Sequence, residues 1–172
     1  MMEVKEPSSI SSSTAVVHVG PGEGRAVRMA GLRLLTCKVS GAQTGGAYSL
    51  FEVAVVPGGG EAPHVQHRED ECFYVLEGSF EFVIEGSKVE ADPGSLVYVL
   101  KGTLHAFWNT GQMTGRMLVS QTPGGLYEGF VEEVGEPAAG ETTTPAKDDL
   151  PEAERLAAAG AKYGVEMVWP LS

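Results

Sequence analysis

The sequence predicts an all-β fold, an antiparallel sandwich or barrel, followed by short helices near the C-terminus. Short apolar or alternating segments recur from residue 15 to residue 122, and Gly-rich breaks separate them. Such regularly spaced short strands are typical of β-sandwiches and β-barrels. Phe80, Phe82 and Ile84 alternate with more polar residues, as in a strand with one buried face. The segments predicted as strands are 15–19, 32–39, 48–56, 71–76, 79–85, 95–100, 105–108 and 116–121.

The pattern changes to a helical one after these segments. Apolar residues at helical spacing predict a short helix in 125–134, packed on the β-structure. Residues 135–151 are rich in Gly, Pro, Thr and charge, which predicts an irregular strap, and Pro151 opens a second helix. Residues 165–171 are apolar enough to pack down. The predicted organisation is a flexible tail (1–14), a β-domain (15–134), and a C-terminal strap and helix (135–172).

The length and the net charge of the chain limit the class of protein to which it can belong. A chain of 172 residues suits one domain with a real core. Acidic residues outnumber basic ones 23 to 12, so long-range repulsion argues against nucleic acid or an anionic membrane as a partner. No apolar run approaches the ~20 residues of a membrane span, and residues 1–14 lack a secretory pattern, so a cytoplasmic location is expected. Cys37 and Cys72 lie far apart in apolar segments and are expected to be buried free thiols.

The four histidines of the chain carry information through their positions. If His64 begins a strand, alternation puts His64 and Gln66 on one face and His67 on the other. A metal pair of His64 and His67 would then need a bulge or turn between them. His18 stands alone near the N-terminus and is expected to be a structural or surface residue.

Two further segments carry polar residues on the face expected to point inward. Glu71 shares a face with Phe73, and His105 shares one with Phe107. Bringing these faces together with that of His64 and Gln66 gives two imidazoles, an amide and a carboxylate in an apolar interior. Such a cluster is costly to bury unless it is hydrogen-bonded or holds a metal. The pocket around it is expected to be lined by Phe73, Phe82 and Phe107, with Tyr98 either at its mouth or packed.

Two linked motifs then give a resemblance to a known family. Gly58, His64, Glu71 and Gly78 match the spacing Gly-x5-His-x-His-x4-Glu-x6-Gly, with Gln66 where the second His is expected. Gly94, Gly102, His105 and Asn109 match Gly-x5-Pro-x-Gly-x2-His-x3-Asn, with Leu100 in place of Pro. These are the two motifs of the cupin superfamily, and residues 64–78 look especially like its single-domain, quercetin 2,3-dioxygenase-like branch. The resemblance implies a double-stranded β-helix, the jelly-roll cupin barrel, over residues 15–134.

The same resemblance implies a divalent transition metal (Fe, Mn, Ni, Co or Zn) held by His64, Gln66, Glu71 and His105. Gln66 departs from the family pattern, and an amide oxygen is a weaker donor than imidazole. Three outcomes stay open: four protein ligands, two His and one carboxylate with Gln66 bonded to a bound water, or a hydrogen-bonded pocket without metal. Glu71 is the expected catalytic base, because a partly buried carboxyl has a raised pKa unless a cation offsets it.

The leading hypothesis for function is therefore a metal-dependent, oxygenase-type cupin acting on a small aromatic or enolic molecule. The alternatives are a non-catalytic cupin that binds a small molecule at a degenerate site, and a metal-assisted isomerase, lyase or cyclase. Outward aromatic residues and the habit of the family imply a homodimer formed by sheet-to-sheet packing. Asn109 is expected to fix a turn with Gly111.

Overall fold

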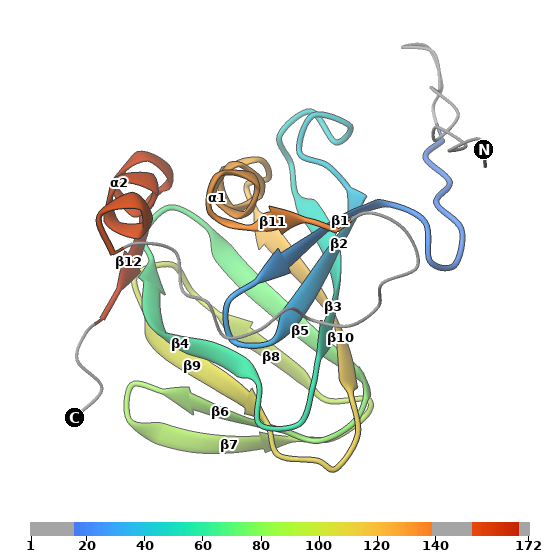
Figure 1. Ribbon diagram of the computed structural model, residues 1–172, viewed down its shortest axis with the longest axis vertical. Coiled ribbons are helices and arrows are strands. Elements are labelled where there is room, and N and C mark those ends of the chain that lie inside the picture. Colours follow the sequence, from blue (N-terminus) through green and yellow to red (C-terminus); the bar gives the residue numbers. More distant parts are fainter. Residues whose placement is uncertain (1–15, 139–152, 169–172) are drawn as a thin grey trace.

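The computed structural model describes residues 16–138 and 153–168, which form two facing antiparallel sheets and two helices (Figure 1). The larger sheet has the strand order β11-β1-β2-β3-β10-β5-β8, and the smaller has the order β12-β4-β9-β6-β7. The chain crosses between the sheets repeatedly, as from β3 to β4 and from β9 to β10, which is the jelly-roll arrangement. The predicted all-β jelly roll with short C-terminal helices is confirmed.

The elements have the following bounds. The larger sheet contains β1 (Arg25–Met29), β2 (Arg33–Val39), β3 (Ser49–Val55), β5 (Asp70–Glu77), β8 (Leu96–Val99), β10 (Gly115–Thr122) and β11 (Glu136–Pro137). The smaller sheet contains β4 (Gly60–Gln66), β6 (Phe80–Ile84), β7 (Ser87–Ala91), β9 (Leu104–Asn109) and β12 (Val165–Met167). The helices are α1 (Leu126–Val134) and α2 (Ala153–Tyr163).

Several strand predictions were wrong. Residues 16–19 form no strand, and the sheet instead begins with β1, whose short alternation of Val27 and Met29 is hidden by neighbouring arginines. β7 was missed because only Ala91 of its residues is buried. β4 begins at Gly60, inside a predicted Gly-rich break. Glycine is suited to this strand position because a Cβ there would collide with the carbonyl of Phe107 on the neighbouring strand.

Aromatic rings fill the space between the sheets. The ring centroid of Phe73 lies 5.1 Å from that of Phe82 and 5.6 Å from that of Phe107, both in edge-on contact. Such edge-to-face packing adds to the stabilisation from burial alone. Asn109 closes one end of this interior, because its side chain donates to the carbonyls of Val55 and Met113 and accepts from the N–H of Gly111. Its expected structural role is confirmed.

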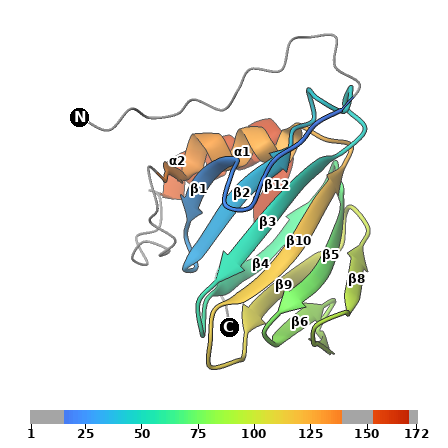
Figure 2. The same cartoon turned by 90° about the vertical axis from the view of Figure 1, so that its right-hand side faces the viewer.

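The two helices lie side by side at one end of the barrel (Figures 1 and 2). A Cβ at Gly129 of α1 would collide with the ring of Tyr163 of α2, so glycine permits their close approach. The Glu69 carboxylate accepts the first free N–H groups of α1, those of Leu126 and Tyr127. Both predicted helices are confirmed, and β12 pairs with β4 as the expected packing of the C-terminus requires.

Some expectations fall partly or wholly outside the described residues. The tail 1–14, most of the strap, and residues 169–171 of the apolar C-terminus are among these. His18 is described and exposed, as expected. Both cysteines are free thiols, but each is only partly buried: Cys72 lies on the outer face of β5, and Cys37 packs at the margin of the core beside Glu128 of α1. Among the described residues, neither helix is long and apolar enough to cross a membrane.

Candidate metal centre

Two imidazoles and one carboxylate meet inside the barrel, and we call them the triad: His64 on β4, Glu71 on β5 and His105 on β9. One ligand atom from each lies within 4.8 Å of the others. Glu71 Oε2 is 2.7 Å from His105 Nε2 and 3.8 Å from His64 Nε2. All three side chains are almost completely buried. The structure therefore brings together three of the four residues expected from strand alternation and the motifs.

Strand pairing explains how the triad assembles. His64 and His105 are direct partners across β4 and β9, which places their ring centroids 4.2 Å apart. Glu71 comes from the opposite sheet, where β5 runs between β8 and β10. The ligand set thus spans both sheets, and the packing of one sheet on the other sets its distances.

Backbone contacts fix the orientation of both imidazoles. Nδ1 of His64 lies 2.9 Å from the carbonyl of Ala62, and Nδ1 of His105 lies 3.0 Å from the carbonyl of Thr103. A carbonyl only accepts hydrogen bonds, so each Nδ1–H donates and each Nε2 faces the triad, where the neutral ring offers a lone pair. This is the outer contact usual for metal-binding histidines.

The atoms at the centre of the triad have no hydrogen bond within the described residues. Nε2 of both imidazoles and Oε2 of Glu71 are buried without a partner of acceptable geometry, despite the 2.7 Å approach of His105 to Glu71. Unpaired buried polar atoms are costly, and two imidazole nitrogens with a carboxylate oxygen suit a divalent transition metal. The residues present therefore fit the metal that the motifs imply.

The charges of the triad are coupled. Burial alone lowers the pKa of His64, but the nearby carboxylates of Glu61 and Glu71 outweigh it and raise that pKa to about 9. Burial raises the pKa of Glu71, but the two imidazoles outweigh it and hold that pKa well below its ordinary value. Glu71 is therefore ionised, and its pKa is lowered and not raised, because the imidazoles supply the offset to burial that the sequence analysis allows for.

Gln66 lies on the inward face of β4, as expected. Its side chain is buried, and both amide atoms lack a hydrogen-bond partner in the described part of the chain. An amide in this state has a donor and an acceptor free for a ligand. Gln66 as a metal ligand stays a prediction.

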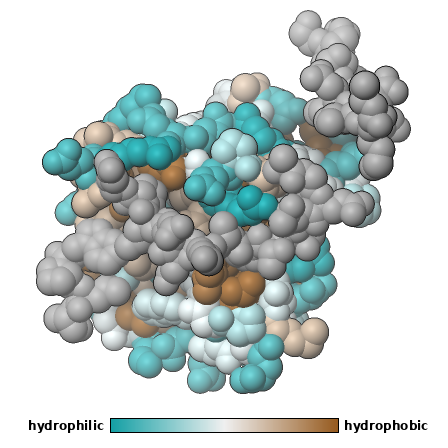
Figure 3. Space-filling model, viewed as in Figure 1, coloured by the Kyte–Doolittle hydropathy of each residue, from teal (hydrophilic) through white to brown (hydrophobic). Residues whose placement is uncertain are grey.

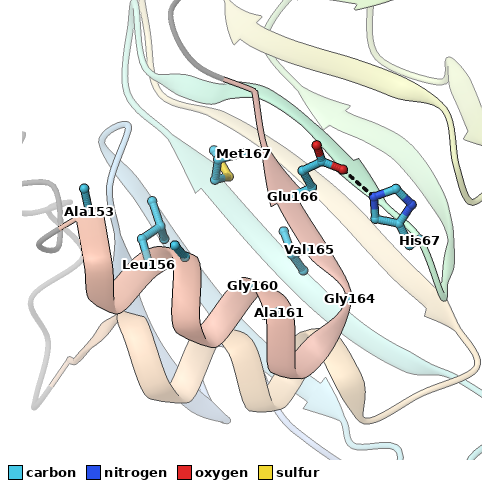
Figure 4. Close-up of a pocket in the computed structure, with 10 residues that line it drawn as sticks. His67, Ala153, Leu156, Gly160, Ala161, Gly164, Val165, Glu166 and Met167 are labelled. Carbon is cyan, nitrogen blue, oxygen red and sulfur yellow. Dashed lines mark hydrogen bonds and ion pairs between the residues drawn. The ribbon is translucent and has the colours of Figure 1, made fainter.

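His67 points away from the triad, as alternation predicts. It is half-exposed, and its Nε2 lies 2.7 Å from Glu166 of β12. This pair stands at one end of a surface groove of about 740 Å³ between α2 and β12 (Figure 4). The groove is lined mainly by small and apolar side chains such as Leu156, Val165 and Met167. None of the triad residues lines it.

The predicted aromatic pocket differs from the structure in two ways. Phe73, Phe82 and Phe107 are buried and pack on one another, and Phe73 and Phe107 line an interior cavity of about 10 Å³, roughly the space of one water. Tyr98 does not reach this interior. It lies on the outer face of β8, where its hydroxyl donates to Asp70 over 2.9 Å, because alternation turns Val97 and Val99 inward instead.

The sequence did not reveal a second buried polar cluster next to the triad. Arg33 of β2, Glu61 of β4 and Tyr127 of α1 interact there. By alternation Glu61 should face away from His64, but the pairing of β4 with β9 is irregular between these residues, and this turns both side chains inward. Pro63 was the available signal, because proline within a strand marks an edge or a bulge.

Comparisons with known proteins agree with this fold. Residues 51–120 match the sequence model of a family described as "Cupin domain". A predicted oxalate decarboxylase from Thermotoga maritima has the same fold (21% identity, TM-score 0.57, covering 62% of this chain and 98% of that one). The polyketide cyclase RemF from Streptomyces resistomycificus is also similar (28% identity, TM-score 0.53, covering 61% of this chain and 78% of that one). No curated protein matches the sequence significantly.

Proposed function

We propose that this chain, whose residues 51–120 match the family model described as "Cupin domain", is a cupin and a metal-dependent enzyme acting on a small enolic or aromatic molecule. The observation that carries the proposal is the triad, because its three central donor atoms are buried and lack hydrogen bonds among the described residues. The donor set suits Fe, Mn, Ni, Co or Zn. When bound, a divalent ion supplies Lewis-acid polarisation of a substrate oxygen.

The protein side chains supply orientation, water exclusion and a proton acceptor. The carbonyls of Ala62 and Thr103 hold the two imidazoles with Nε2 toward the centre. Gln121 donates to Oε1 of Glu71 over 3.4 Å, which leaves Oε2 facing the imidazoles. We assign to the ionised Glu71 the acceptance of the substrate hydroxyl proton. The free amide of Gln66 hydrogen-bonds the substrate or completes the metal ligands.

Two reaction classes compete for this site. An oxygenase-type reaction, which consumes O2, is supported by the two-His-one-carboxylate donor set and by the resemblance of residues 64–78 to the quercetin dioxygenase-like branch. A redox-neutral cyclisation or isomerisation is supported by the similarity to the polyketide cyclase RemF. We favour the oxygenase-type reaction, because the donor set belongs to this chain itself.

One experiment tests the proposal and separates the classes. Metal-free protein is loaded with each candidate ion, its metal content is measured, and turnover of a panel of enols and phenols is followed in air and under strict anaerobiosis. We expect about one ion per chain and O2 consumption that matches product. Negligible metal under every loading condition would refute the proposal. Unchanged anaerobic turnover would replace the oxygenase with the redox-neutral enzyme, and tight ligand binding without turnover would indicate a binding protein.

We also propose that the chain forms a homodimer, and that β8, the edge strand of the larger sheet, pairs with its own copy in place of the sheet-to-sheet packing expected from the sequence. Residues 95–100 carry no charge, and the side chains of Leu96 and Tyr98 are 60% and 54% exposed. β7, the edge of the smaller sheet, instead carries Lys88 and Glu90, and charges protect an edge from pairing. On the face shown in Figure 3, hydrophobic residues appear only in small separate patches. A two-fold axis would pair β8 with its own copy.

Solution mass tests this partner. We expect sedimentation to give a dimer, and Leu96→Lys to give a monomer, because a buried lysine opposes the pairing. The surface variant Val89→Lys on β7 is the matched control. A monomeric mass of the unaltered chain at every concentration would refute the dimer.

A further inference from the structure

We propose that Arg33 and Tyr127 form a subsite for one anionic oxygen beside the triad, so that the substrate is recognised as a monoanion, a carboxylate or an enolate. This inference rests on the proposed function, because the anion is the group that the metal site receives. It assigns a role to a cluster outside the two motifs.

Three elements position the subsite. Arg33 NH1 lies 2.8 Å from Glu61 Oε2, and the Tyr127 hydroxyl donates to Glu61 Oε1 over 3.1 Å. Arg33 Nε donates to the carbonyl of Ala30, while its NH1 makes a long contact of 3.5 Å to the Tyr127 oxygen. All three side chains are buried. Donors from β2 and α1 are therefore held in fixed directions inside the barrel.

The subsite is connected to the triad. Glu61 Oε1 lies 4.0 Å and Glu71 Oε2 lies 3.8 Å from the same atom, His64 Nε2. The cavity of about 10 Å³ is lined by Arg33, Glu61 and Tyr127, and also by Glu71 of the triad. This space holds about one oxygen-sized group between the two clusters.

An unpaired atom at the cavity points to a ligand there. Gln121 lines the cavity, and its Oε1 is buried without a hydrogen-bond partner in the described part of the chain. A buried acceptor of this kind is normally satisfied by a donor, such as a water or a substrate hydroxyl. A water, or a hydroxyl of the ligand next to its anionic oxygen, meets this need.

Charge selects the ligand. Arg33 and Glu61 neutralise each other, and Glu71 offsets one of the two charges of a divalent ion. One positive charge remains, and in a low-dielectric interior it is strongly favourable to balance it. A ligand with one negative charge does so, whereas a neutral ligand leaves the charge and a dianion reverses it.

The Tyr127 hydroxyl is suited to the anion. Burial and the nearby Glu61 carboxylate raise its pKa well above the ordinary value, so the group stays a hydrogen-bond donor. Rotation about the C–O bond redirects its proton from Glu61 to the anion, and Glu61 keeps its contact with Arg33. A hydrogen bond to a charged group contributes about a tenfold change in affinity or more.

The test uses full-length protein loaded with Co²⁺, whose visible absorption reports on the metal environment. The probe is formate, the smallest carboxylate, and the neutral probe is formamide. We expect formate to bind saturably and formamide to bind at least about tenfold more weakly. Tyr127→Phe and Arg33→Lys should each weaken formate about tenfold and leave Co²⁺ affinity unchanged, while the surface control Tyr74→Phe should change neither.

The outcomes separate this inference from the proposed function. Normal Co²⁺ binding with equal affinity for formate and formamide, or with unaltered formate affinity in both subsite variants, overturns the subsite alone. The cluster would then be only a structural ion pair. Failure of the unaltered protein to take up Co²⁺ or any other candidate ion overturns the proposed function and the subsite together. Thermal unfolding of each variant checks that it is folded.

Discussion

Two polar clusters lie next to each other inside the barrel, and they differ in how their buried atoms are satisfied. Arg33, Glu61 and Tyr127 contact one another through an ion pair and hydrogen bonds. In the triad, the central atoms of His64, Glu71 and His105 have no hydrogen bond among the described residues. A buried cluster whose charges are paired with one another needs no bound ion. A buried cluster of metal-ligand atoms without hydrogen bonds is stabilised by one. The first cluster therefore holds its side chains in place before any ligand binds, and the second depends on an ion.

The largest expected effect comes from breaking the paired cluster. Arg33→Met should lower the free energy of unfolding by about 3–5 kcal/mol, because it leaves the buried Glu61 carboxylate without its cation. Urea denaturation of the metal-free protein measures this. The control is Arg116→Met, which removes ion pairs to Glu52 and Glu77 at the surface and should cost about 1 kcal/mol or less. Equal losses of unfolding free energy in the two variants would contradict the prediction that the buried ion pair matters more to stability than a surface ion pair.

The next effect comes from removing a charge from the triad. Glu71→Gln should lower metal affinity by at least about 100-fold, since even residues that only orient metal ligands contribute 10–100-fold. Competition with a chelator measures the affinity, and Glu90→Gln on exposed β7 is the control. Unaltered affinity in Glu71→Gln would show that the triad is not the metal site.

Restoring the motif sharpens the same comparison. Gln66→His should raise metal affinity by about tenfold, because imidazole is a better donor than an amide oxygen for these ions. The chelator titration that serves Glu71→Gln serves here also. If affinity stays the same, residue 66 is not a ligand position and Gln66 instead contacts water or substrate.

The smallest effect concerns Glu69, a third buried carboxylate that is paired with backbone N–H groups and not with a cation. Burial is the main cause that raises its pKa from 4.5 to about 7. Between about pH 4.5 and about pH 7 the folded state therefore binds more protons than the unfolded state, and the stability of the protein falls as pH rises through this range. Relative to Glu69→Gln, the unaltered protein should lose about 1 kcal/mol from about pH 6 to about pH 8. Parallel stability profiles of the two proteins would contradict this origin.

Strand alternation predicted most of the triad because it is a local rule. Glu71 and His105 lie in regular stretches of their strands, and β4 is regular from His64 onward, so the inward direction of the three side chains follows from sequence position. Glu61 escaped the rule because the irregularity between it and His64 changes the face to which it points. Arg33 escaped because a charged residue at the start of a strand is ordinarily exposed.

Other features depend on packing between distant elements. Apolar residues at helical spacing in 125–134 predicted a packed helix, but the Tyr127 hydroxyl reaches Glu61 only because α1 docks on the end of the barrel. The volume left between the sheets is likewise a tertiary property. Phe73, Phe82 and Phe107 were expected to surround a pocket, and the interior cavity that Phe73 and Phe107 line has room for about one water.

The most direct test of the central claim is the position and amount of metal in the loaded protein. Elemental analysis should give about one ion per chain, and a crystal of that protein should show one anomalous peak between His64, Glu71 and His105. A peak at the surface pair of His67 and Glu166, or no bound ion after loading, would contradict the account.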